Sequence, residues 1–107
     1  MPSVARVPAP VFAALGDETR LGLMAHLCQV GPTSITRLTT GASVSRQAVA
    51  KHLRVLEDCG LARSRRQGRE SVWELQPRRL QAARTYLDQM SASWDQALGR
   101  LKAFVER

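Results

Sequence analysis

The sequence predicts a mainly α-helical domain that carries one small β-hairpin. Apolar residues recur at helical spacing along most of the 107 residues, whereas the stretch from Leu61 to Leu75 changes to two short runs around a glycine. The length limits the chain to one domain and leaves no room for an open α/β sheet with a cofactor crevice. Most enzyme scaffolds are therefore excluded.

The N-terminal third predicts an arm and two helices. Three prolines in residues 1–10 are typical of an extended arm, and a short helix follows from Val11 to Leu15, closed by Gly16. Asp17 is placed to cap a second helix that ends at the Gly31-Pro32 pair. The apolar positions of this second helix recur at helical spacing: Leu21, Met24, Leu27 and Cys28.

Two further helices are expected in the middle of the chain. Ser34 can cap a short third helix that carries Ile35 and Leu38 and ends near Gly41. Ser45 caps, and Gly60 ends, a fourth helix. Its apolar face comprises Val49, Leu53 and Leu56, and its wet face is mostly basic at the start.

The last third predicts the hairpin and one long helix. Strands from Leu61 to Arg66 and from Arg69 to Leu75 are expected around a Gln67-Gly68 turn, and Pro77 ends the second strand. The long helix carries an apolar series at alternating three-four spacing, named the terminal stripe: Leu80, Ala83, Leu87, Met90, Trp94, Ala97, Leu101 and Phe104. The expected organisation is an arm (1–10), a core unit (11–76) and a C-terminal helix of the same domain (77–107).

Positive charge is concentrated in one part of this sequence. The formal net charge is +7 and the isoelectric point is near 11.0, which indicates an acidic partner. From Arg37 to Arg69 there are eight basic and two acidic residues, a surplus of six. This region holds the third and fourth helices and the hairpin, the parts of a winged helix-turn-helix that meet a DNA duplex. The terminal helix mixes both signs, which does not favour a membrane-binding surface.

Three segments resemble one known family. They are Leu15-Gly16-Asp17-Glu18-Thr19-Arg20-Leu21, the run from Ser45 to Leu61, and Arg66-Gln67-Gly68-Arg69-Glu70. In this order and spacing the chain resembles the ArsR/SmtB family of bacterial winged helix-turn-helix transcriptional regulators. The resemblance implies a homodimer on a roughly palindromic operator, with the fourth helix in the major groove and the wing near the minor groove. It also implies that the first and last helices form the dimer interface.

The residues expected to contact DNA lie at the start of the fourth helix and around the wing. Capping by Ser45 leaves the first turn outward, so that Arg46 can read guanine and Gln47 can read adenine. Lys51 can reach a base or a phosphate, and small Ala50 permits close approach. His52 is either a DNA contact or a locally packed residue, and Arg54 and Arg63 are either contacts or solvated. The wing residues expected to follow a phosphate wall or the minor groove are Arg65, Arg66, Gln67 and Arg69.

The terminal stripe is longer than a small winged core can cover. The alternatives are an intramolecular core and a dimer seam, of which we expect the seam. With the family resemblance, the expected dimer-interface residues are Phe12, Leu80, Leu87, Met90, Trp94, Leu101 and Phe104.

No metal, cofactor or catalytic site is expected. One metal site of the family uses a Cys-x-Cys pair where this chain has Ser34 and Thr36, and another uses Asp and His residues along the terminal helix, which has no histidine here. Of a thiol pair known in relatives only Cys28 remains, expected on the apolar side of its helix; the other cysteine is Cys59.

The sequence therefore predicts a cytoplasmic, homodimeric DNA-binding repressor without a bound metal. An activator or architectural DNA-binding protein, and a winged-helix module that binds only proteins, are the alternatives. No phosphate loop, nucleophile motif or zinc motif points to an enzyme.

Overall fold

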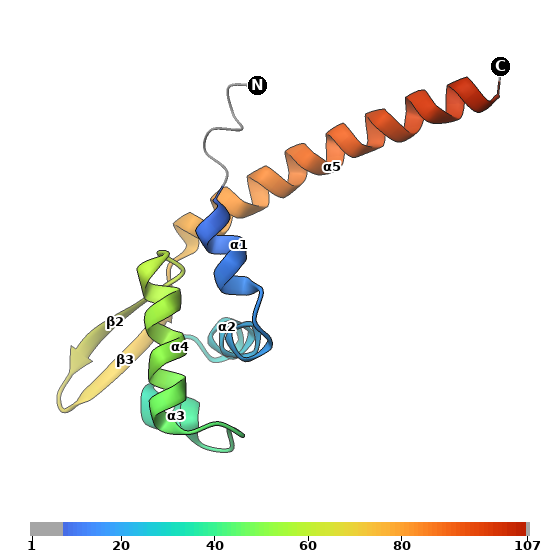
Figure 1. Cartoon of the computed structure of the whole chain (residues 1–107). Coiled ribbons are helices and arrows are strands. Elements are labelled where there is room, and N and C mark those ends of the chain that lie inside the picture. The colour runs from blue at the N-terminus through green and yellow to red at the C-terminus, as the bar shows by residue number, and fades with distance from the viewer. Residues whose placement is uncertain (1–7, 107) are drawn as a thin grey trace.

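The computed structural model describes residues 8–106, and it confirms a mainly α-helical winged helix-turn-helix (Figure 1). The elements in chain order are α1 (Ala9–Leu15), α2 (Glu18–Val30), β1 (Thr33–Ser34), α3 (Ile35–Thr39), α4 (Arg46–Asp58), β2 (Ala62–Gln67), β3 (Glu70–Leu75) and α5 (Pro77–Val105). Most of the expected arm lies outside the described residues. Helix α1 begins at Ala9, not Val11. Pro10 is tolerated in the first turn, because a backbone N–H at this position would have no partner inside the helix.

The expected helix caps are confirmed. The side chains of Asp17, Ser34 and Ser45 accept hydrogen bonds from the backbone N–H groups of residues three positions later, at 3.0, 3.2 and 3.1 Å. Each satisfies a donor that has no partner inside the helix. At the other ends, Gly31 and Gly60 adopt φ values of 74° and 82°, which L-residues with side chains rarely adopt.

The buried face of α2 differs from the expected one. Leu23, Met24 and Leu27 are buried, whereas Leu21 is 50% exposed and Cys28 is exposed. The expectation of Cys28 on the apolar side was therefore wrong. Leucine and methionine occur on more than one side of this helix, so that periodicity alone did not define the packed face.

The sheet has three antiparallel strands in the order β1-β3-β2. The sequence predicted only the hairpin: the two-residue strand β1 pairs with β3 through Thr33↔Trp73 and Ser34↔Val72. The turn is Gly68-Arg69, one residue later than expected, because Gln67 pairs with Glu70. Gly68 has a φ of 66°, and within residues 8–106 only glycines have a positive φ, so that the φ of Arg69 is negative. This combination is typical of a type II′ turn, in which glycine is the first of the two central residues.

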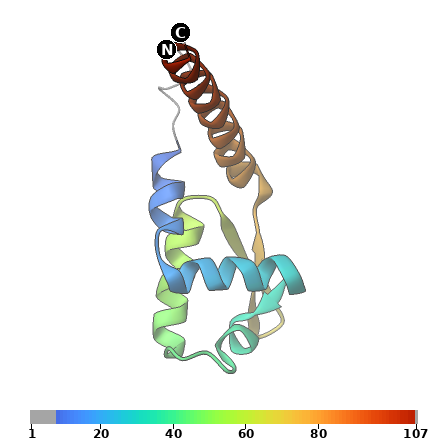
Figure 2. The ribbon, with the colours of Figure 1, turned by 90° about the vertical axis from the view of Figure 1, so that its right-hand side faces the viewer.

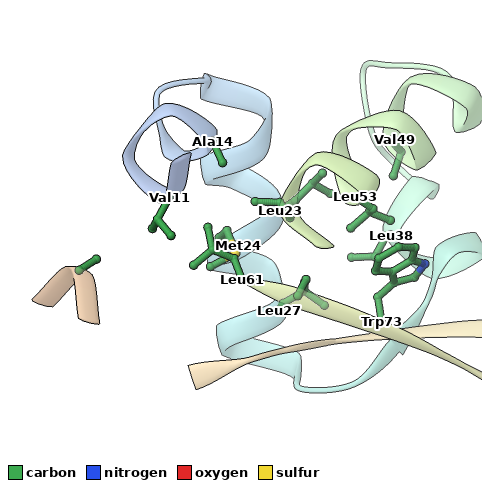
Figure 3. Packing of buried hydrophobic residues seen from close by; sticks show 13 residues of the cluster. Val11, Ala14, Leu23, Met24, Leu27, Leu38, Val49, Leu53, Leu61 and Trp73 are labelled. Atoms are coloured by element: carbon green, nitrogen blue, oxygen red, sulfur yellow. The ribbon is translucent and has the colours of Figure 1, made fainter. Parts of the chain in front are cut away.

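The core lies between the helices and one face of the sheet (Figure 3). The predicted stripe of α4 is confirmed, since Val49, Leu53 and Leu56 are 0% exposed. Trp73 of β3 lies beside Leu38 and Leu53 in Figure 3. This packing fixes α4 against α3 and the sheet and leaves its opposite face free.

Helix α5 projects away from the rest of the molecule (Figures 1 and 2). Its start is anchored by buried Ala83 and by Tyr86, whose ring centroid lies 5.7 Å from that of Phe12. Beyond this anchor the helix extends free, and the molecule measures 67 × 29 × 20 Å. Within residues 8–106 no helix combines the length and apolar character that a membrane crossing requires.

Candidate nucleic-acid interface

The start of α4, helix α3 and the hairpin tip lie together at one end of the molecule, remote from the C-terminal end of α5 (Figures 1 and 2). All three belong to residues 37–69 or adjoin them, the segment with the surplus of positive charge. The starts of α3 and α4 and the exposed part of α5 thus lie at opposite ends of one protomer.

One face of α4 is free of contacts with the core. Gln47, Lys51 and Arg54 are exposed and follow one another at four and three positions, so that they share a side of the helix. We name these three residues the reading face. Ala50 is half-buried at its edge. Arg54, which the sequence left open as a solvated residue, belongs to this same face.

Arg46 is exposed but is not free. Its Nη1 donates a hydrogen bond to Oγ1 of Thr36 in α3, at 3.2 Å. The sequence analysis expected the first turn of α4 to face outward and did not identify Thr36 as a partner. Ten positions separate the two residues, and no pattern in the sequence predicts a hydrogen bond between them. Ser45 serves as the N-cap, because its Oγ accepts from the backbone N–H of Ala48.

His52 lies about 140° around the helix from Gln47, at about 100° per residue. Its Nδ1 is 3.2 Å from Nη1 of Arg20 and 3.8 Å from the carboxylate of Asp17, and the side chain is 24% exposed. Arg20 also donates from Nε to the carbonyl of Ala14 in α1, at 2.6 Å. Of its two alternatives, His52 thus makes the local contacts in the free protein.

The cap of α2 is coupled to this cluster electrostatically. The backbone N–H of Arg20 holds the pKa of Asp17 below its usual value, and the charges of Arg20 and His52 act in the same direction. A carboxyl with a lowered pKa stabilises the fold above its unfolded pKa, and this stabilisation is lost as pH falls through the folded value. The stabilisation that ionised Asp17 gives to the start of α2 is therefore fully present at neutral pH.

The wing divides its polar residues between two faces. Side chains alternate along β2, and Ser64 lies opposite buried Trp73. Ser64 donates from Oγ to Glu57 of α4 at 3.0 Å, so that its face of the sheet is the α4 side. Arg66, two residues later, shares that face, whereas Arg65 and Gln67 lie on the opposite face.

The two faces also differ in ion pairing. Arg63 and Arg65 lie 2.8 and 3.8 Å from the carboxylate of Glu74. Across residues 8–106 no ion pair involves Arg66 or the turn residue Arg69. The wing thus presents Arg66 and Arg69 as uncompensated cations, and Arg63 and Arg65 as partly neutralised ones.

The predicted dimer residues fall into two groups. Phe12 and Leu80 lie near the anchor of α5, half-buried and 36% exposed. The others project into solvent with exposed fractions from 49% to 68%: Leu87, Met90, Trp94, Leu101 and Phe104. They are therefore not part of the protomer core. Leu98 and Val105 are exposed as well and were not among the predicted residues.

Within the described part of the chain, no group of three or more His, Cys, Asp or Glu side chains is placed to hold a metal ion. Cys28 and Cys59 are both free thiols, the first exposed and the second half-buried.

Comparison with known proteins points to one family. A model of the bacterial regulatory protein, arsR family, matches residues 17–64, which run from the cap of α2 into β2. The chain is similar to the HTH-type transcriptional regulator Rv2034 of Mycobacterium tuberculosis, at 38% identity over 90% of this chain and 86% of that protein. It is also 34% identical to the arsenical resistance operon repressor of Escherichia coli, over 66% of this chain and 61% of that one.

Solved structures share the fold. An ArsR-like transcriptional regulator from Rhodococcus sp. RHA1 superposes with a TM-score of 0.77 at 39% identity, covering 91% of both chains. A domain of Mb0332 from Mycobacterium bovis, described as a homodimeric winged helix-turn-helix DNA-binding domain, has a TM-score of 0.63 at 23% identity, covering 79% of this chain and 77% of that one.

Proposed function

Because the chain belongs to the ArsR family of bacterial transcriptional regulators, we propose that it is a homodimeric repressor that binds a palindromic operator. As a member of this family it is a regulator with a winged helix-turn-helix DNA-binding domain, and not an enzyme. The observation that carries the proposal is the reading face of α4, which is exposed and carries Lys51 and Arg54.

In the proposed complex α4 enters the major groove. Gln47 forms a bidentate contact with adenine, and Lys51 and Arg54 contact bases or phosphates along the same side of the helix. Arg46 reads guanine, and Ala50 allows the backbone to approach a thymine methyl. Ser45 contributes mainly as the cap that orients the first turn. His52, the remaining candidate, contacts DNA only if it leaves Arg20 and Asp17.

Replacing Gln47 with alanine is expected to cost about 1–3 kcal/mol of binding free energy on the operator and little on a random duplex, because Gln47 is proposed to read a base. The operator is obtained by selecting bound duplexes from a random pool, and affinities are measured by fluorescence anisotropy. Gln29→Ala, at an exposed position of α2, is the matched control and should leave both affinities unchanged.

Salt dependence tests the class of partner in the same experiment. About eight neutralised phosphates per dimer give a slope of log K against log salt near −7. A flat salt response, or selection that enriches no sequence, would reject the proposed function. Equal losses on operator and random duplex would assign Gln47 to the backbone.

The wing arginines are expected to differ. Arg66→Ala should lower affinity for operator and random duplex alike and reduce the salt slope by about 2, one phosphate contact from each protomer, because Arg66 lies on the α4 side without an ion pair. Arg69→Ala should act in the same way. Arg65→Ala, the matched control, should have a smaller effect because Arg65 lies on the other face near Glu74. A larger loss for Arg65 than for Arg66 contradicts the assignment of the two faces.

The proposed dimer forms through α5 and α1. Exposed apolar side chains on a projecting helix are costly in water, and burial against a second copy stabilises each by about 1.5–3 kcal/mol. The proposed interface comprises the exposed part of the terminal stripe together with Leu98, Val105 and Phe12. A two-fold axis relates the two reading faces of the dimer in the same way as it relates the two halves of a palindrome.

Repression follows if the operator overlaps a promoter, because a dimer spanning both half-sites excludes other proteins from that DNA. The name of the Escherichia coli relative supports this direction of control. Measuring transcription from the promoter of the gene that encodes this protein, with and without the protein, distinguishes a repressor from an activator.

A further inference from the structure

The hydrogen bond between Arg46 and Thr36 links the first turn of the reading helix to α3. Nη1 of Arg46 donates to Oγ1 of Thr36 at 3.2 Å, and both residues are exposed. Within residues 8–106 no carboxylate forms an ion pair with Arg46. In the described part of the chain, the side-chain partner of Arg46 is a neutral hydroxyl.

The hydroxyl of Thr36 sits on a well-held turn. The carbonyl of Thr36 accepts hydrogen bonds from the backbone N–H and from Oγ1 of Thr40, at 3.2 and 2.9 Å. Ser34 caps the other end of α3. Buried Leu38 and Val49 belong to the common core and fix α3 against α4. The position of the hydroxyl relative to α4 is thus set by the fold.

Stability gives no reason for an arginine at this position. Residue 46 is the first helical residue of α4, where the helix dipole disfavours a cation. A hydrogen bond between two exposed side chains stabilises the fold by a small amount, comparable to the cost of a cation at the start of a helix. Since the two effects are small and opposite, stability alone does not account for Arg46.

We propose that Thr36 is a positioning residue, which holds the Arg46 guanidinium ready for bidentate recognition of guanine. The guanidinium has five N–H donors, so that one bond to Thr36 leaves four, enough for O6 and N7 of one base. An arginine loses rotamer freedom when it binds. A bond already present in the free protein removes part of that loss and excludes orientations that suit other bases. The inference rests on the proposed function, in which α4 is the reading helix.

The test compares Thr36→Val, which removes the hydroxyl at constant shape, with Thr36→Ser, which keeps it. Thr36→Val should lower operator affinity about 3–10-fold, the size of one net hydrogen bond, and should leave random-duplex affinity unchanged. Thr36→Ser should stay within about twofold of the natural protein. Thr85→Val on exposed α5 is the control for the same chemical change far from α4, and urea unfolding confirms that each variant is folded.

A double-mutant cycle identifies the route of the effect. In an Arg46→Ala background, Thr36→Val should have no further effect on operator affinity. A loss that persists in this background shows that Thr36 acts without Arg46, and an equal loss on random duplex makes it a phosphate contact; both overturn the proposal. The proposal is also overturned if Arg46→Ala lowers operator affinity and Thr36→Val does not. The proposed function fails separately, if selection from the random pool enriches no sequence or binding does not depend on salt.

Discussion

Trp94→Ala is expected to raise the dissociation constant of the dimer by about 30- to 1,000-fold, which corresponds to about 2–4 kcal/mol for an aromatic interface anchor. The side chain is 66% exposed in the protomer and projects from α5 beyond the anchored part. It therefore contributes little to the protomer core and has a large area to bury against a second copy. Sedimentation over a range of protein concentrations measures the change.

The matched control is Gln96→Ala, which lies on the opposite side of the same exposed helix. It should leave the dissociation constant unchanged. Operator affinity should fall for Trp94→Ala whenever the protein concentration is below its new dimer dissociation constant, because one protomer engages only one half-site. A Trp94→Ala protein that remains dimeric but unfolds more easily would place Trp94 in a protomer core and contradict the proposed interface.

Leu53→Ala is expected to lower the free energy of unfolding by about 2–5 kcal/mol, a large share of the 5–15 kcal/mol typical of a domain. Leu53 is 0% exposed and lies among α2, α3 and the sheet, so that truncation leaves a cavity under the reading helix. Urea unfolding at a fixed protein concentration measures the loss.

Arg54→Ala, the next residue on the exposed side of α4, is the control and should change the unfolding free energy by no more than about 0.5 kcal/mol. The pair separates folding from DNA contact, because Arg54→Ala should weaken binding without affecting stability. A loss below about 1 kcal/mol for Leu53→Ala would mean that the core collapses around the missing side chain.

Local signals predicted the helices of this chain well. Asp17, Ser34 and Ser45 cap as expected, and Gly60 ends α4, because caps depend on residues within one turn. The stripe of Val49, Leu53 and Leu56 was identified because most of the remaining residues of α4 are polar.

Features that depend on distant residues were not predictable. Strand β1 has two residues and exists through its pairing with β3, nearly forty positions later. Leu23 replaces Leu21 in the core because the surrounding elements, not the sequence of α2, decide which side is covered. The wing turn shifted by one residue because Gly68 satisfies a positive φ at either central position of a two-residue loop.

The candidate site was predicted as a set of residues but not as an arrangement. The sequence grouped Arg65, Arg66, Gln67 and Arg69, and only the pairing of Ser64 with Trp73 assigns them to different faces. The contact of His52 with Arg20 spans 32 positions, and that of Arg46 with Thr36 spans ten. Both needed the packed structure.

In the proposed dimer, the projecting helix α5 sets the distance between the two α4 helices. Its 29 residues extend about 43 Å at 1.5 Å per residue, longer than the roughly 34 Å of one DNA turn. The point along α5 at which two copies cross sets the separation of the two α4 helices, whereas the residues of α4 set the bases that each one recognises. In the proposed complex, the spacing of the half-sites therefore depends on α5, and the base sequence of each half-site depends on α4.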